Sequence, residues 1–370
     1  MKKSYDEHFL VAKLATSENH EMVSSLAGWF KTKIPDADNL KLLSFHAPSD
    51  SGGFSGETRI ANIEWLEGGR AAEKKVVIRS EIHGANAPES SFHKMVSLQK
   101  ILGNIPDLPV PQVFWSEDDI SVIGGPFFVM DFIEGKAAPD SPPFASAGWV
   151  FEASKESRES MYHSGLEFLV KLHSLDWQNL GLGFLMHEGD GKTQTRRHLD
   201  LMVSIYDRAT EGNRTSLADK SIDWLYRHVP ETEALSISWG DARLGNMLWR
   251  DFKCVAALDW ELCTLAEPAA DLAWWIFFEK ATTEGLGLTR LDGMLERDQM
   301  IDFYESLSNT AVANFCYHEI FAGFRALVTV THMMKIWERA GQQLYGPGSS
   351  IENNPIAATL EQVMMETVDR

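Results

Sequence analysis

Ile133-Glu134-Gly135 separates two kinds of sequence in this chain of 370 residues. Before it, short runs rich in β-branched and aromatic residues predict strands at 40–45, 60–65, 76–79, 112–115 and 126–132, with one helix over 88–102. After it, helical spacing of apolar residues predicts helices at 158–175, 199–206, 222–228, 298–307 and 313–340, interrupted by a β-hairpin over 247–258. We therefore predict an α+β fold with a β-rich N-terminal lobe, 1–132, and a larger, mainly helical C-terminal lobe, 133–370.

The composition is that of a globular protein with an acidic surface. Hydrophobic residues make up 44% and charged residues 24% of the chain, which is ordinary for folded domains. Asp and Glu number 53 against 34 Lys and Arg, giving a net charge of −19. Such a charge repels phosphate backbones and anionic lipids, and the basic clusters at 74–75 and 196–198 are short and isolated. We expect neither nucleic acid nor membrane as a partner.

Cysteine usage predicts a reducing compartment. The three cysteines are odd in number and lack C-x-x-C spacing, which argues against a disulfide framework or a thiolate zinc site. The N-terminus sustains no apolar run of signal-peptide length, and Leu272–Phe278, the longest apolar run, is too short to span a bilayer. We expect a cytoplasmic protein, and the oligomeric state stays open.

The residues that point to chemistry lie between Ser236 and Trp275. Asp241 and Asn246 have the D-x-x-x-x-N spacing of a kinase catalytic loop, in which the Asp accepts the substrate hydroxyl proton and the Asn holds magnesium. Asp259 follows thirteen residues after Asn246, at the end of the hairpin's second strand. Magnesium prefers hard oxygen ligands and keeps several waters, so one carboxylate and one amide oxygen suffice. The predicted metal ligands are Asn246 and Asp259, and the predicted base is Asp241.

Three motifs around these residues resemble the aminoglycoside phosphotransferase family of small-molecule kinases: W-G-D-A-R-L-G-N at 239–246, A-L-D-W-E at 257–261 and P-A-A-D-L-A-W at 268–274. The likeness runs from about Pro48 to Ala340 and is greatest to the branch with kinase-like domains fused to some acyl-CoA dehydrogenases. It implies a bilobal protein-kinase-like fold that binds ATP and Mg²⁺ between its lobes. Many members have His-Gly-Asp where this chain has Trp239-Gly240-Asp241, and that His is regarded as structural.

The resemblance assigns phosphate contacts to two places in the N-terminal lobe. Gly52, Gly53 and Ser55 match the loop that covers the phosphates, where small residues let backbone N–H groups approach. Without the resemblance, the same residues would be read as a β-turn. Arg79 ends a predicted strand where the family has a basic residue that reaches the phosphates, with a surface arginine as the alternative.

Further residues carry less specific signals. Glu89 is the nearest candidate for the acidic partner of Arg79, and main-chain groups near Asp131 and Ile133 resemble the hinge that bonds adenine. Arg243 would orient the catalytic loop or meet the phosphoryl group, and the sequence does not separate the two roles.

Three more polar residues have a structural alternative. Glu261 shares the face of Asp259 if the strand continues, which would suit a metal or water-shell role as well as a structural one. Asp271 is expected to brace the catalytic loop from the following helix, and His173 to be a structural histidine.

We therefore predict a Mg-ATP-dependent phosphotransferase that moves the γ-phosphoryl group to a hydroxyl of a small molecule. The acceptor is an aminoglycoside-like sugar or a hydroxyacyl-CoA, and its pocket is expected from 180–228 and 303–337. Two alternatives stay open. One is a catalytically inactive kinase fold used for binding. The other, a hydrolase built on Asp241 and Asp259, leaves Asn246 unexplained.

Overall fold

The computed structural model describes residues 18–47, 56–81, 92–339, 341–346 and 348–368. Contacts along the chain divide it into two compact units. The first unit ends at Ile133, and the second combines the short segment Ile105–Val110 with the chain from Glu134 onward. A main-chain bond from Ala257 N–H to Pro109 O (2.7 Å) ties that short segment to the second unit.

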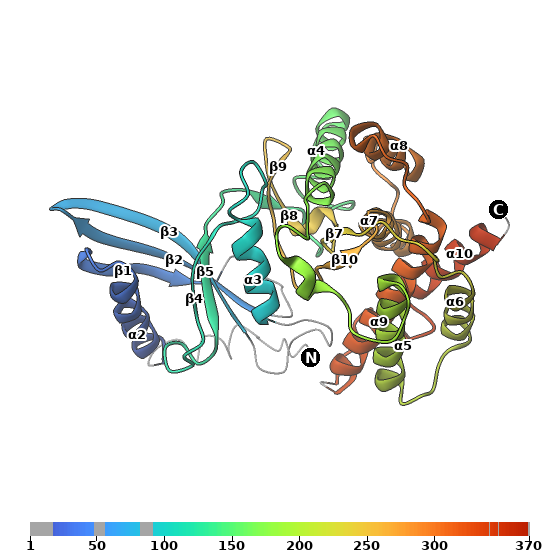
Figure 1. Cartoon of the computed structure of the whole chain (residues 1–370), viewed down its shortest axis with the longest axis horizontal. Helices are drawn as coiled ribbons and strands as arrows, with labels where there is room; N and C mark the ends of the chain where they lie inside the picture. The colour runs from blue at the N-terminus through green and yellow to red at the C-terminus, as the bar shows by residue number, and fades with distance from the viewer. Residues whose placement is uncertain (1–17, 48–55, 82–91, 340, 347, 369–370) are drawn as a thin grey trace, which may run out of the picture. The chain divides into compact units, whose positions relative to one another are not determined.

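The first unit is built on a five-stranded antiparallel sheet of order β1-β2-β3-β5-β4 (Figure 1). Its elements are α2 (Glu18–Lys33), β1 (Asp38–His46), β2 (Gly56–Glu67), β3 (Arg70–Glu81), α3 (Phe92–Leu102), β4 (Val113–Glu117) and β5 (Phe127–Asp131).

The hairpin between β2 and β3 is tighter than the sequence indicates. Glu67 pairs with Arg70, so only Gly68 and Gly69 form the turn, both at positive φ (56° and 82°). A two-residue turn with positive φ at both positions matches the right-handed twist of the strands. Both strands are therefore longer than the predicted 60–65 and 76–79, and the segment 70–75 between those predicted strands lies in β3.

Helix α2, which sequence reasoning missed, packs against β1 and supplies part of the core of this unit. Leu26 lies one helical turn before Trp29 and Phe30, and all three are buried together with Ala61 and Ile63 of β2. The apolar residues of α2 recur at helical spacing (Met22, Val23, Leu26, Trp29 and Phe30), so the sequence contained a signal that could have located this helix.

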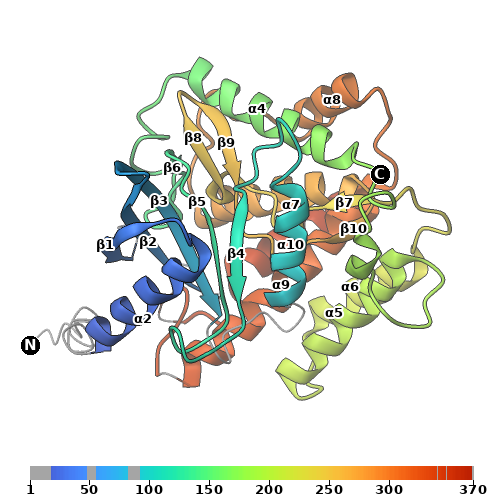
Figure 2. The same ribbon diagram turned by 60° about the vertical axis from the view of Figure 1, so that its left-hand side comes forward.

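The second unit is mainly helical and carries two small sheets, β6-β8-β9 and β7-β10 (Figure 2). Its long helices are α4 (Lys155–His173), α5 (Gln194–Thr210), α6 (Ser216–Arg227), α7 (Ala269–Thr282), α8 (Arg297–Ser308), α9 (Phe315–Arg339) and α10 (Pro355–Val368). The strands are β6 (Lys136–Ala137), β7 (Ser236–Ser238), β8 (Met247–Arg250), β9 (Lys253–Ala257) and β10 (Thr264–Ala266), and short 3₁₀ helices are η1 (Leu182–Leu185), η2 (Leu244–Asn246) and η3 (Glu284–Leu286).

Helix α7 is the centre of this unit. All seven residues from Asp271 to Phe277 are buried, and α9 and α10 pack against the helix. An antiparallel sheet in one unit and a helical second unit confirm the predicted α+β class. Within the described ranges, no helix is both long enough and apolar enough to cross a bilayer.

Candidate active site

The loop of residues 239–246 connects β7 to β8 and ends in the 3₁₀ helix η2. Its second residue, Gly240, has φ +87°, and a Cβ atom there would overlap the carbonyl oxygen of Leu262. Both the dihedral angle and the close backbone approach require glycine at this position. The G of the W-G-D motif is thus explained by the path of the main chain.

Asp271, in the first turn of α7, braces this loop from beneath. Its buried carboxylate accepts hydrogen bonds from the backbone N–H groups of Trp239 (2.7 Å) and Gly240 (2.8 Å) and from the Ser238 hydroxyl (2.9 Å). His173 of α4 adds a fourth contact, from Nε2 at 3.0 Å. The predicted bracing role of Asp271 is confirmed.

The pKa of Asp271 reflects two opposing effects. Burial acts to raise the pKa, and the hydrogen bond and charge of His173, together with the two backbone donors, outweigh burial and lower it. His173 in turn contacts the Tyr304 hydroxyl through Nδ1 (2.8 Å). Both ring nitrogens of His173 have partners inside the protein, which confirms a structural histidine.

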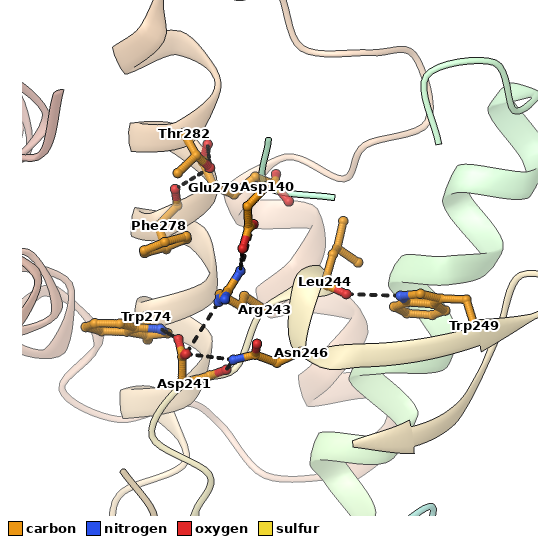
Figure 3. Close-up of polar contacts among 10 residues, drawn as sticks. All are labelled: Asp140, Asp241, Arg243, Leu244, Asn246, Trp249, Trp274, Phe278, Glu279 and Thr282. Atoms are coloured by element: carbon orange, nitrogen blue, oxygen red, sulfur yellow. Dashed lines mark hydrogen bonds and ion pairs between the residues drawn. The ribbon is translucent and has the colours of Figure 1, made fainter. Parts of the chain in front are cut away.

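Asp241 lies on the other side of the loop, and its side chain is 17% exposed. Its Oδ1 accepts a hydrogen bond from the indole N–H of Trp274 (2.7 Å), and its Oδ2 accepts one from Asn246 Nδ2 (2.6 Å) and a longer one from Arg243 Nε (3.4 Å). Figure 3 shows the three donors converging on this one carboxylate. The structure therefore brings together Asp241, Arg243 and Asn246, three of the predicted site residues.

The amide orientation of Asn246 follows from its neighbours. Nδ2 faces two acceptors, the main-chain oxygen of Asp241 (3.0 Å) and Asp241 Oδ2 (2.6 Å), so an amide oxygen in that position would meet only acceptors. Oδ1 of Asn246 consequently points away from Asp241. An amide oxygen held in this way fits a hard cation.

Asp259 reaches the same neighbourhood through the backbone. The Leu258 N–H donates to the main-chain oxygen of Asn246 (2.8 Å), and the Trp239 indole N–H donates to Leu258 O (2.9 Å). The next residue, Asp259, is partly buried and has φ +59°, a conformation uncommon outside glycine. Local backbone strain of this kind clusters at functional sites.

Glu261 does not share a strand with Asp259, as the predicted metal or water-shell role required. Strand β9 ends at Ala257, and Glu261 lies in the turn after Trp260. Because the backbone leaves the extended conformation at Asp259, residues two apart no longer share a face. The premise for grouping Glu261 with Asp259 is therefore wrong, and its role stays untested.

Arg243 lies between two carboxylates. Its guanidinium contacts both oxygens of Asp140 (2.8 and 2.9 Å) and one oxygen of Asp241, and it lies over the Phe278 ring at 5.2 Å. Burial acts to lower the pKa of Arg243, and the charges of Asp241 and Asp140 outweigh it and raise the pKa. A Cβ at Gly245 would approach the guanidinium within 2.5 Å, so the glycine of R-L-G-N leaves room for this ion pair. These contacts favour loop orientation for Arg243.

Arg79, Asp131 and Ile133 belong to the first unit. Arg79 lies within β3 opposite Phe128, and the strand continues to Glu81, so Arg79 does not end the strand as predicted. β3 continues past Arg79 because its antiparallel pairing with β2 extends as far as Glu81, which pairs with Gly56.

Asp131 is the last residue of β5, and Ile133 follows it as a half-buried residue. The Asp131 N–H donates to Gln112 O (2.9 Å), so this N–H already has a partner within the first unit. Burial raises the pKa of the Asp131 carboxyl, and the charge of Lys74 opposes the rise.

Gly52, Gly53, Ser55 and Glu89 lie outside the described residues. Within the part of the chain that is described, no group of three or more His, Cys, Asp or Glu side chains could hold a metal ion. The proposed pair of Asn246 and Asp259 contains only one such side chain.

Sequence reasoning missed Trp274 and Asp140. Trp274 lies three residues after Asp271, one helical turn along α7, and this spacing would have placed it on the side of the loop. Asp140 lies 103 residues before Arg243 in a Pro- and Ser-rich loop, and no local pattern predicts their contact.

The sheet of the first unit and the helices and loop of the second define a kinase-like fold. A model of the phosphotransferase enzyme family matches residues 66–304, more than half of the chain. The chain belongs to this family, and the resemblance to the aminoglycoside phosphotransferases is confirmed.

Curated relatives include acyl-CoA dehydrogenase family member 10 of Mus musculus, 31% identical over 208 residues. That match covers 55% of this chain and 18% of the mouse protein, so the chain spans less than a fifth of its relative.

Solved structures share the fold at low identity. A Ralstonia eutropha protein assigned to the aminoglycoside phosphotransferases has a TM-score of 0.68 at 22% identity, covering 93% of this chain and 98% of that chain. A thermostable mutant of aminoglycoside phosphotransferase APH(4)-Ia, in ternary complex with ADP and hygromycin B, has a TM-score of 0.54 at 12% identity, covering 92% and 98%.

Proposed function

We propose that this protein is a Mg-ATP-dependent phosphotransferase that moves the γ-phosphoryl group of ATP to a hydroxyl of a small molecule. The observation that carries the proposal is the Asp241 carboxylate, held by donors from Trp274, Asn246 and Arg243 and still partly exposed. Family membership and the nucleotide bound by the APH(4)-Ia relative support it.

The proposed step transfers the γ-phosphoryl group of ATP to the acceptor oxygen. The acceptor oxygen forms a bond to the γ-phosphorus, the bond from the γ-phosphorus to the β,γ-bridging oxygen breaks, and ADP leaves. The hydroxyl proton passes to the Asp241 carboxylate. Phosphoryl transfer has a loose transition state, so positioning of the hydroxyl and neutralisation of charge supply most of the rate.

Asn246 Oδ1 and the Asp259 carboxylate are the groups that would hold Mg²⁺, since both are hard oxygen donors. Magnesium, when bound, neutralises phosphate charge. Arg79, main-chain groups at Asp131 and Ile133, and the sequence-assigned residues Gly52, Gly53 and Ser55 are proposed nucleotide contacts, with Glu89 proposed as the partner of Arg79.

The acceptor is proposed to be an aminoglycoside-like sugar or a hydroxyacyl-CoA. The name of the mouse relative, an acyl-CoA dehydrogenase family member, favours the acyl compound. The charges at the loop favour neither acceptor, because the Arg243 guanidinium is matched by the carboxylates of Asp140 and Asp241.

ADP release measured with Mg-ATP and each of kanamycin, erythromycin, choline and 4-hydroxybutyryl-CoA tests the activity. We expect one acceptor to raise ADP release well above the rate with water alone. Asp241→Asn should lower that turnover by about 10²–10⁴-fold, because the base is lost. Calorimetry should find Mg-ATP affinity close to that of the native protein in this variant, because Asn246 and Asp259 remain.

Asp259→Asn should lose both Mg-ATP binding and turnover. Near-native turnover in Asp241→Asn would exclude Asp241 as the base. Nucleotide binding without stimulation by any acceptor in the panel would support the alternative of an inactive kinase fold used for binding.

A further inference from the structure

Trp274 is almost fully buried, with 3% of its surface exposed, and its indole N–H points at the candidate base. A buried indole N–H needs an acceptor, because it can only donate. Here the acceptor is Asp241 Oδ1, at 2.7 Å. Two other tryptophans of the second unit, the buried Trp249 and the half-buried Trp177, donate to backbone carbonyls, those of Leu244 and Leu235. Trp274 instead uses the carboxylate to which the proposed function assigns the chemistry.

The direction of this N–H is fixed by the contacts of the indole ring. Phe278, one turn further along α7, stacks with the ring at 5.9 Å between centroids and 21° between planes. The Arg325 guanidinium of α9 lies over the ring at 4.6 Å and donates to Gly240 O (3.1 Å). A ring held by a stacked aromatic and a cation has little freedom to turn, so its N–H has one orientation. Figure 3 shows Trp274 and Phe278 on the face of α7 that points toward Asp241.

The donors around Asp241 also leave a defined place for the acceptor. A carboxylate offers about four lone-pair positions. Asn246 and Arg243 approach Oδ2, and Trp274 approaches Oδ1. One position on Oδ1, beside the indole N–H, is left for a hydroxyl.

We propose that Trp274 is a positioning residue: its N–H sets the rotamer of Asp241 so that the free position of Oδ1 faces the acceptor hydroxyl. This inference rests on the proposed function, because it takes Asp241 as the base. Without the N–H, the carboxylate can turn about its χ angles, and fewer encounters have the geometry that proton transfer requires.

Trp274→Phe tests the proposal, because it removes the N–H and retains an aromatic ring between Phe278 and Arg325. We expect kcat for ADP release, with the best acceptor of the panel above, to fall about 10- to 100-fold. Losses of this size are typical when a residue that orients a metal-binding side chain is removed, and Trp274 is proposed to orient the Asp241 side chain in the same way. The KM for Mg-ATP should stay within about twofold, since the variant touches no proposed nucleotide or metal ligand. Trp177→Phe, which also loses one indole hydrogen bond, should retain native kcat.

A double variant separates positioning from general damage to the fold. If Trp274 acts through Asp241, Trp274→Phe should lower turnover no further once Asp241 is Asn. Multiplicative losses in the double variant, or native kcat in Trp274→Phe, would overturn the inference.

A spectroscopic measurement tests the contact without any acceptor. The chain has 12 tryptophans, and the Trp274 indole signal is the one missing from the ¹⁵N-correlated NMR spectrum of Trp274→Phe. In the native protein it should lie downfield of the Trp177 signal and move upfield in Asp241→Asn, because the acceptor loses its charge. An unmoved signal would contradict the contact. Native turnover in Asp241→Asn would instead overturn the proposed function.

Discussion

Helix α7 buries one carboxylate in its first turn, Asp271, and another in its last turn, Glu279. The pKa values of the two are shifted in opposite directions. Asp271 accepts from two backbone N–H groups, a serine hydroxyl and His173, and its pKa is lowered although burial acts to raise it. Glu279 is equally buried, and burial raises its pKa despite Arg290 (2.8 Å) and the Tyr162 hydroxyl, which also donates to it.

The difference follows from position on the helix and from the kind of donor. The N-terminus of a helix favours a negative charge and the C-terminus disfavours it. Backbone donors are held rigidly, so the first turn of α7 secures the loop that carries Asp241. The last turn is joined through the long side chain of Arg290 to a segment with no assigned chemistry. The loop that carries Asp241 is thus attached at the end of α7 where a buried negative charge is best stabilised.

Asp271→Asn should have the largest effect. Its new NH₂ group replaces one of the two carboxylate oxygens. It would face either the Trp239 N–H, which binds Oδ2, or the Gly240 N–H, which binds Oδ1, so one buried backbone N–H loses its acceptor. We expect a loss of about 3–5 kcal/mol in the free energy of unfolding, measured by urea denaturation, and a fall in turnover of at least about 100-fold. The matched control is Asp298→Asn, in the first turn of α8 with an 83% exposed side chain, which should cost under about 1 kcal/mol. Equal stabilities of the two variants would break the comparison.

Gly240→Ala should have the next largest effect. The new Cβ would overlap Leu262 O in a left-handed backbone conformation, so we expect a loss of about 2–4 kcal/mol, from the dihedral angle and the overlap together. Gly287→Ala is the control, since Gly287 follows η3 at φ +73° and a Cβ added there would have no atom within 4 Å. It should lose only the dihedral contribution, about 1–2 kcal/mol. Thermal unfolding of both variants measures the difference, and a Gly287→Ala loss as large as that of Gly240→Ala would contradict it.

Glu279→Gln should have a smaller effect than either. A glutamine oxygen can still accept from Arg290 or Tyr162. Because burial disfavours the charged form of Glu279, the neutral side chain should change the free energy of unfolding by less than about 1 kcal/mol. Turnover should stay within about twofold of the native rate. A fall in ADP release as large as that of Asp271→Asn would show that both ends of α7 support the site, and would contradict the difference between its first and last turns.

The smallest effect is a difference in pH dependence. Because the folded pKa of Asp271 lies below its ordinary 3.8, its contribution to stability is present above pH 3.8 and is lost as the pH falls through the folded pKa. Glu279 has the opposite sign: its folded pKa lies above 4.5, so its contribution is present below pH 4.5 and is lost as the pH rises through the raised pKa. Urea midpoints should be measured from pH 3 to 8. In Asp271→Asn the midpoint should change less with pH on the acid side, and in Glu279→Gln it should change less with pH above pH 4.5. The reverse assignment would overturn the stated directions.

Much of the fold could be predicted because its signals are local. Helical spacing identified α4, α8 and α9, and alternating or β-branched runs identified the central strands. Helices α2 and α10 were missed, as were the two-residue strand β6 and the strands β7 and β10. Short strands become stable only by pairing with distant segments, such as Ser238 with Thr264, and no local pattern marks such pairing.

The sequence by itself determined the α+β class, the family motifs and the spacing that joins Asp241 to Asn246, because each depends on residues close together in the chain. Tertiary structure alone decided which groups hold Asp241: Trp274 approaches from a helix 33 residues away, and Asp140 reaches Arg243 across 103 residues. Contacts over such separations depend on how helices and loops pack, since a carboxylate takes whichever buried donors the packing brings within hydrogen-bond distance.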